Sequence, residues 1–189
     1  MDFDAIVLAG GRGSRLGGVS KSDLRRDAVT LLELALRAAT GARKVVVVGD
    51  VAAATGYTVA RESPPHSGPV AAIAAGLGAL AAGSRTHTLV LACDVPGSAA
   101  AVRALQERIE HADEPADGVI AVDGEARDQY LVAVYSTSAL AARFSSIPTR
   151  DASMRQLVEG LALDRVLVPA GSTDDVDTWQ DAANLGVTR

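Results

Sequence analysis

The chain is poor in the residue types that nucleic-acid binding requires. Only 3% of its 189 residues are aromatic, whereas proteins that hold single strands stack the bases on aromatic side chains. The formal net charge is −5 and no block of basic residues occurs, so the clustered positive charge that neutralises a phosphate backbone is missing. The composition therefore argues against nucleic acid as the main partner.

The chain also lacks the features of disulfide scaffolds, zinc sites and membrane spans. Cys93 is the only cysteine, which excludes an internal disulfide and a cysteine-rich zinc site. No apolar run approaches the ~18 residues of a transmembrane helix, and no basic start leads into the apolar stretch of a secretory leader. We expect a cytoplasmic protein with no membrane contact.

What the chain does contain is short runs of small aliphatic residues. Runs that are nearly continuous and rich in valine and isoleucine are typical of parallel strands, because both faces of such strands are buried. The clearest examples are AIVL (5–8), KVVVVG (44–49), TLVLAC (88–93) and GVIAV (118–122).

Helical stretches separate these runs. The first, 30–39, opens with Thr30 and has Glu33 three residues later, which is the spacing of a capping box. Two longer helices are predicted at 69–83 and 98–112. The second half of the chain is predicted to contain strands at 129–135 and 164–170, and helices at 138–144, 151–161 and 178–186. This alternation predicts an α/β fold, a three-layer sandwich with a mostly parallel, Rossmann-like sheet, in one domain.

A glycine-rich loop, LAGGRGSRLGGVSK (8–21), directly follows the first predicted strand. Glycines let successive backbone amides point at phosphate oxygens. The dinucleotide fingerprint would need a glycine in place of Leu16, and a P-loop would need a lysine in place of Val19. What distinguishes the loop is the spacing of Arg15 and Lys21, which lie six residues apart with glycines between them. The alternative is a flexible surface loop with two solvated cations.

Asp94 follows the run 88–93 and thus lies at the carboxyl end of a predicted strand, where ligands bind in open α/β sheets. A carboxylate in that position suits Mg²⁺, although aspartate also favours the turn that Pro96 predicts. Further on, Asp175 and Asp177 have a spacing that puts both on one side of an extended segment. They are interpreted either as metal-facing groups or as helix-capping residues.

Several of these segments resemble one family. Leu8-Ala9-Gly10-Gly11, with Arg15, Gly17 and Lys21, is similar to the loop of the GT-A type nucleoside-triphosphate transferases. Within that superfamily the chain most resembles the molybdenum cofactor guanylyltransferases. The segments that match in the same order are HSGPVAAIAAGL (66–77), ACDVP (92–96), ARDQYLVAVYSTSAL (126–140) and DVDTWQDAANL (175–185).

The resemblance implies that the loop binds a nucleoside triphosphate. Backbone amides around Gly10, Gly11 and Gly13 would hold the triphosphate. Arg15 would stabilise the leaving pyrophosphate, and Lys21 the α-phosphate as negative charge builds there. These three catalytic residues, Arg15, Lys21 and Asp94, would act by positioning and charge neutralisation.

The resemblance also implies where the base lies. Leu8 and Ala9 would contact it through their backbone, and Gly68 belongs to the segment that in the family leads into a helix beside the base. Glu62, with Asp50 as the alternative, would accept hydrogen bonds from the base or the ribose. The alternative for Glu62 is a solvated loop carboxylate.

The metal site implied by the resemblance consists of Asp94 and Asp177, with Mg²⁺ as the cofactor; whether Asp175 replaces Asp177 is left open. No residue suggests itself as a protein nucleophile. Cys93 lies in a predicted buried strand, and the three histidines are interpreted as structural or solvated residues, namely His66, His87 and His111.

The expected function is therefore transfer of GMP from GTP to the phosphate of molybdopterin, with release of pyrophosphate. Residues 1–96 would bind the nucleotide and residues 97–189 the molybdopterin-type acceptor, with possible contact to molybdoenzyme maturation proteins. The closing Asp175-Val176-Asp177-Thr178 differs from the Asn-x-Asn-Thr usual in the guanylyltransferases and is known from cytidylyltransferases, so CTP is an alternative to GTP. Two different functions compete with this one, namely a sugar-phosphate nucleotidyltransferase and a non-catalytic nucleotide-binding regulatory domain.

Overall fold

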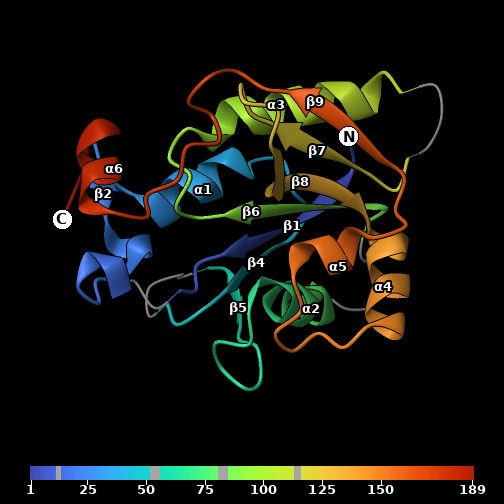
Figure 1. The fold of residues 1–189 in the computed structure, drawn as a ribbon. Coiled ribbons are helices and arrows are strands. Elements are labelled where there is room, and N and C mark those ends of the chain that lie inside the picture. The colour runs from blue at the N-terminus through green and yellow to red at the C-terminus, as the bar shows by residue number, and fades with distance from the viewer. Residues whose placement is uncertain (12–13, 52–55, 81–84, 113–115) are drawn as a thin grey trace.

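A seven-stranded sheet forms the centre of the molecule (Figure 1). The structure is a computed structural model that describes residues 1–11, 14–51, 56–80, 85–112 and 116–189. In order across the sheet, the strands are β5 (Thr58–Ala60), β4 (Val45–Val48), β1 (Phe3–Leu8), β6 (His87–Ala92), β8 (Asp128–Ser136), β7 (Gly118–Val122) and β9 (Leu163–Leu167).

The sheet is mostly parallel, as the sequence predicts. Within the described residues, β8 is the one strand of this sheet that runs opposite to the others. It pairs antiparallel with both β6 and β7, whereas the remaining pairs are parallel. All residues of β1 and β7 are buried, which explains their nearly continuous apolar sequences. β5 was not predicted, because its three residues at the edge of the sheet are too few to show a period.

Helices cover both faces of the sheet and complete the predicted three-layer sandwich (Figure 1). On one face lie α1 (Leu31–Ala38) and α3 (Ser98–Glu110); on the other lie α2 (Pro69–Leu80), α4 (Thr137–Ser146) and α5 (Met154–Val158). Alternate residues of β1 point to opposite layers, because side chains in a strand alternate. Ala5 and Val7 pack with α1 and α3, whereas Ile6 and Leu8 pack with α2.

The helix predicted at 151–161 is shorter than expected. Ser153 is its N-cap and forms a capping box with Gln156, so the helix begins at Met154, and it ends at Val158. Among the described residues, no helix has the length and apolarity needed to cross a membrane.

A small second sheet, unpredicted, lies at one end of the molecule. It consists of β10 (Val187–Thr188), β2 (Arg25–Arg26) and β3 (Val29–Thr30), and α6 (Trp179–Asn184) precedes β10 (Figure 1). A separate group of buried side chains, here called the strap cluster, joins the C-terminal end of the chain to the glycine-rich loop and the segment that follows it. Its members are Leu16, Leu24, Leu31, Val176, Ala182 and Val187.

The predicted capping box at the start of α1 is present. The Thr30 hydroxyl oxygen accepts a hydrogen bond from the Glu33 amide at 3.1 Å, and the Glu33 carboxylate accepts one from the Thr30 amide at 2.8 Å. The hydrogen bonds from the backbone and the hydroxyl of Thr30 lower the pKa of Glu33 below its ordinary value.

Glu33→Gln is expected to make the protein less stable near neutral pH, because glutamine keeps the capping box but loses the carboxylate charge. A depressed folded-state pKa stabilises the protein above the unfolded-state pKa of about 4.3, and this advantage is lost as pH falls through the folded-state pKa. Urea unfolding of both proteins between neutral pH and about pH 2 measures the difference. A difference that stayed constant over that range would contradict the assignment.

Candidate active site

The residues predicted to carry chemistry meet at the carboxyl ends of β1, β4 and β6. Close backbone approach holds these ends together. The Cys93 amide donates to the Leu8 carbonyl at 2.9 Å, and the Ala9 amide donates to the Val48 carbonyl at 2.8 Å. A Cβ at Gly49 would lie 2.7–2.8 Å from backbone atoms of Ala9 and Gly10, and its φ is +152°, so only glycine fits there.

Lys21 is the centre of the polar network at these strand ends. Its ammonium donates to Asp94 Oδ2 at 2.8 Å and to Asp177 Oδ1 at 2.5 Å. Asp94 follows β6, Lys21 begins a short 3₁₀ turn (Lys21–Asp23), and Asp177 comes from the C-terminal segment. The structure thus brings together three residues that the resemblance implied for catalysis and metal binding.

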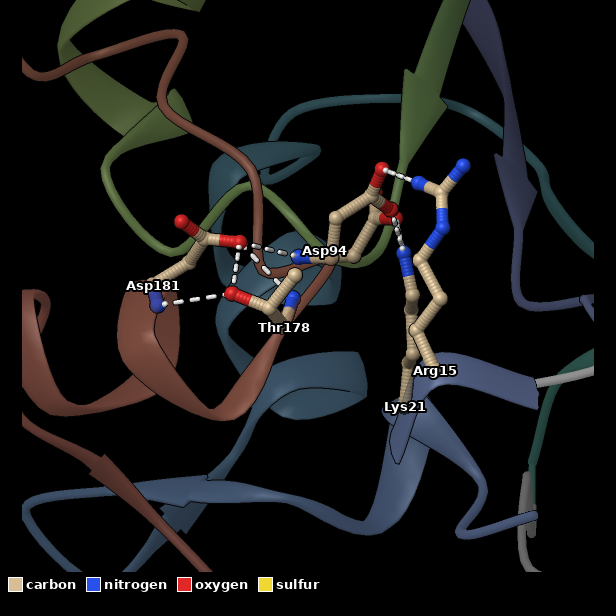
Figure 2. A network of polar contacts seen from close by, with 6 residues as sticks. Arg15, Lys21, Asp94, Thr178 and Asp181 are labelled. Atoms are coloured by element: carbon tan, nitrogen blue, oxygen red, sulfur yellow. Dashed lines mark hydrogen bonds and ion pairs between the residues drawn. The ribbon is translucent and has the colours of Figure 1, made fainter. Parts of the chain in front are cut away.

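Arg15 joins the same network from its rim. Its side chain is 71% exposed, and Nη1 donates to Asp177 Oδ2 at 2.9 Å. Figure 2 shows the side chains of Arg15 and Lys21 lying side by side and reaching the carboxylate group from the same segment of chain. Asp177 therefore contacts both Arg15 and Lys21, one with each carboxylate oxygen.

Helix capping in the C-terminal segment is performed by Thr178 and Asp181 rather than by Asp175 or Asp177. The Thr178 hydroxyl oxygen accepts from the Asp181 amide, and the Asp181 carboxylate accepts from the amide and hydroxyl of Thr178 (Figure 2). Asp181 also accepts from the Asp177 amide at 3.2 Å. The cap holds the backbone of Asp177 while its side chain faces the site.

Three carboxylates converge here. One oxygen from each of Asp94, Asp175 and Asp177 lies within 4.8 Å of the others. Burial and the negative charges of Asp177 and Asp94 raise the pKa of Asp175. Partial burial works to lower the pKa of Lys21, but the two carboxylates that it contacts outweigh burial and raise it, so Lys21 is a cation at neutral pH.

This donor set fits a divalent cation. Carboxylate oxygens are the ligands that hard cations such as Mg²⁺ prefer. Two of the three carboxylates are paired with Lys21, whereas no ion pair to Asp175 is found in the described part of the chain. Excess negative charge among clustered carboxylates is what a bound cation relieves. Asp175 therefore belongs to the cluster together with the predicted Asp94 and Asp177.

A cavity of about 650 Å³ opens beside this cluster. Leu8, Gly10 and Gly11 of the loop line it, together with Lys21 and Asp94. A second cavity, of about 580 Å³, adjoins it across Gly10 and Gly11. Gly13, which was also predicted to hold phosphate, lies outside the described residues.

The residues predicted to contact the base line the same two cavities. Glu62 is part of both walls, and one of its carboxylate oxygens accepts from the His66 amide at 2.9 Å. Gly68 lines the larger cavity at the start of α2. Asp50 lines the smaller one and forms an ion pair with Arg61.

Two further features of these walls bear on the predictions. The Leu8 carbonyl and the Ala9 amide are engaged in backbone hydrogen bonds, so contact with a base would use other atoms of these residues. His66, interpreted from sequence as structural or solvated, lies in the walls of both cavities. His66 opens the segment 66–77 that resembles the family, but the sequence predicted no role for its side chain. The Glu62 carboxylate accepts from the His66 amide in the turn that brings His66 there.

The far wall of the larger cavity was not predicted residue by residue. Asp123, Arg127, Gln129 and Tyr130 line it. Asp123 accepts from the amides of Glu125 and Arg127, each at 2.9 Å, and from the Gln129 side chain at 3.0 Å, which fixes the turn between β7 and β8.

A shift in strand register brings this wall to the cavity. Ile120 pairs with Ala133, but the next residue, Ala121, pairs with Gln129. The intervening residues 130–132 of β8 are thus displaced from β7, and all three line the cavity. Irregularities of this kind are common next to functional sites because they redirect side chains.

The remaining candidates for nucleophilic chemistry are placed as expected. Cys93 is buried, and burial raises the pKa of its thiol, so it stays protonated and unreactive. His87 Nδ1 contacts the Thr86 hydroxyl at 3.0 Å, and His111 Nδ1 contacts the Glu107 carbonyl oxygen at 2.8 Å.

The chain matches one known protein family over most of its length. The family model described as the MobA-like NTP transferase domain matches residues 5–166. The chain belongs to this family. The matched span includes the glycine-rich loop, Lys21 and Asp94, whereas the C-terminal segment with Asp175 and Asp177 follows it.

Solved structures share the fold of this MobA-like NTP transferase. Molybdopterin-guanine dinucleotide biosynthesis protein A from Archaeoglobus fulgidus is 20% identical, with a TM-score of 0.72 and 97% of each chain covered. The 2-C-methyl-D-erythritol 4-phosphate cytidylyltransferase from Thermus thermophilus is 19% identical, with a TM-score of 0.70 and 98% of each chain covered. A Mycobacterium tuberculosis protein in complex with manganese is 17% identical, with a TM-score of 0.72 and 98% of each chain covered.

No curated protein matches the chain at a significant level. At identities near 20%, the structural likeness shows a common fold. The family match supports nucleotidyl transfer from a nucleoside triphosphate as the class of reaction, and the three carboxylates supply a site that suits a divalent metal.

Proposed function

We propose that this MobA-like NTP transferase transfers GMP from GTP to the phosphate of a molybdopterin-type acceptor and releases pyrophosphate. The observation that carries the proposal is the contact of Lys21 with both Asp94 and Asp177 beside a cavity bordered by the glycine-rich loop. Phosphoryl and nucleotidyl transfer depend on positioning and charge neutralisation, and this arrangement supplies both without a protein nucleophile.

In this proposal each residue has a separate role. The backbone around Gly10 and Gly11, together with Gly13, holds the triphosphate. Lys21 leaves its carboxylate partners to contact the α-phosphate, where negative charge grows as the acceptor phosphate attacks. Arg15, which is exposed at the rim, stabilises the departing pyrophosphate.

Asp94 and Asp177 would hold Mg²⁺, with Asp175 as the third carboxylate. A divalent cation held there would supply positive charge to offset the negative charge of the phosphates. The three carboxylates lie at the carboxyl ends of the strands, next to the cavity in which the triphosphate would bind. Residues 1–96 supply the nucleotide wall and residues 97–189 the acceptor wall, including Arg127 and Gln129.

GTP is expected to bind most tightly of the four common nucleoside triphosphates. Guanine presents N1–H and 2-amino donors, and Glu62 offers a carboxylate at the cavity wall. Calorimetry with GTP, CTP, ATP and UTP in the presence of Mg²⁺ measures the order of affinity. Glu62→Gln should reduce the preference for GTP over CTP, because the amide keeps its size but loses its charge.

A cytidylyltransferase is the second candidate, favoured by one feature of the chain. The closing segment contains Asp175 and Asp177 where the guanylyltransferases resembled by the chain have asparagines. A clear preference for CTP in the calorimetric series would replace the guanylyl assignment with this one.

A pyrophosphate-release screen tests the proposed reaction. Each of the four nucleotides is combined with molybdopterin and with several sugar phosphates, in the presence and absence of Mg²⁺. Release that requires both GTP and molybdopterin is the expected result. Release with a sugar phosphate alone would identify a different transferase, and nucleotide binding without turnover with any acceptor would favour a regulatory domain.

A further inference from the structure

The strap cluster includes residues that are next in sequence to members of the charged network. Leu16, next to Arg15, and Leu24, three residues after Lys21, belong to the cluster from the loop side. The C-terminal segment contributes Val176 between Asp175 and Asp177. The same apolar contacts therefore link the segment that bears the cations to the segment that bears the carboxylates.

Val176 is held through both its side chain and its backbone. Its side chain has no solvent exposure, and its amide donates to the Asp94 carbonyl oxygen at 3.0 Å. Because side chains alternate along an extended segment, burial of Val176 turns the two flanking aspartates to the opposite side. That side is where their carboxylates meet Asp94.

We propose that Val176 is a positioning residue for the three-carboxylate site. By anchoring the segment in the strap cluster and to the backbone of Asp94, it sets the separation of the Asp175 and Asp177 carboxylates from that of Asp94. Val176 contacts no substrate in this role. The inference rests on the proposed function, because it assumes that these carboxylates bind a divalent cation.

Mn²⁺ binding to the nucleotide-free protein tests the role, with free Mn²⁺ followed by its electron paramagnetic resonance signal. Val176→Ala is compared with Val187→Ala, which removes the same atoms from the same cluster at a position that is 4% exposed and distant in sequence from the aspartates. Mutation of residues that orient metal ligands typically weakens metal binding by about 10–100-fold, so Val176→Ala should weaken Mn²⁺ binding by about tenfold or more. Val187→Ala should lower the melting temperature similarly and change Mn²⁺ affinity less than about twofold.

Equal loss of affinity in the two variants, or an unchanged affinity in Val176→Ala, would overturn the inference. Asp94→Asn serves as the reference for the site itself. If wild type and Asp94→Asn bound Mn²⁺ equally, the proposed metal site would fail and the inference with it. Should Val176→Ala not fold, Val176→Thr and Val187→Thr, which keep the branched shape, are compared by the same measurement and the same criteria.

Discussion

Replacing Asp94 by asparagine is expected to lower the rate of metal-dependent pyrophosphate release by about 10²–10³-fold, the usual effect of removing one group that stabilises transition-state charge. Asparagine keeps the size of the side chain and an oxygen that can accept from Lys21. It removes the negative charge that would attract the cation to the carboxyl end of β6. The steady-state rate at saturating GTP and Mg²⁺ measures the effect.

The fold should survive this substitution, because the Asp94 side chain is only partly buried and the backbone hydrogen bond between Asp94 and Val176 does not involve the carboxylate. Asp2→Asn is the matched control. Asp2 lies next to the amino end of β1, at the opposite end of the strand from the site, where it pairs with Arg85. Wild-type turnover in Asp94→Asn, with a wild-type melting temperature, would show that the metal assignment is wrong.

Replacing Lys21 by alanine is expected to lower kcat by about 10²–10³-fold while GTP affinity changes by less than about tenfold. The reason is that Lys21 is proposed to contact the α-phosphate where charge builds up in the transition state. Loss of an interaction made mainly in the transition state reduces kcat rather than ground-state binding. Single-turnover rates and calorimetric dissociation constants for GTP separate the two quantities.

Lys44 provides the control, since it is the other lysine of the chain. Its ammonium donates to the carbonyl oxygens of Ala79 and Leu80 near the end of α2, at 2.7 Å and 3.4 Å. Lys44→Ala should therefore lower the melting temperature and leave kcat unchanged. A Lys21→Ala variant with wild-type kcat and much weaker GTP binding would instead assign Lys21 to ground-state nucleotide binding.

The elements that the sequence predicted correctly share one property: their signal is local. The runs that became β1, β4, β6 and β7 are apolar at successive positions because both faces of these strands are covered. The cap of α1 depends on two residues three apart. Elements without a local signal were missed, such as β5 and the small sheet, because strands of two or three residues are too short to show a period. In the small sheet, β2 also pairs with β10 from the other end of the chain.

The candidate site shows the same division. Arg15, Lys21 and Asp94 could be selected from sequence because their types and spacing follow a loop and a strand end. The pairing of Lys21 with Asp177 could not, since the two residues are separated by 156 positions. The interpretation of Asp175 and Asp177 as helix caps could be set aside only when Thr178 and Asp181 were found to form the cap.

By itself, the sequence determined the layered α/β architecture and which charged residues follow the carboxyl ends of its strands. Both could be predicted because strand periodicity and loop composition are properties of neighbouring residues. Only the tertiary structure decided which of those charges meet. The strap cluster packs the C-terminal segment against Leu16 of the glycine-rich loop and the residues that follow the loop, and with this packing Asp177 contacts both Arg15 and Lys21. Contacts of this range depend on how distant apolar surfaces fit together, which no local pattern records.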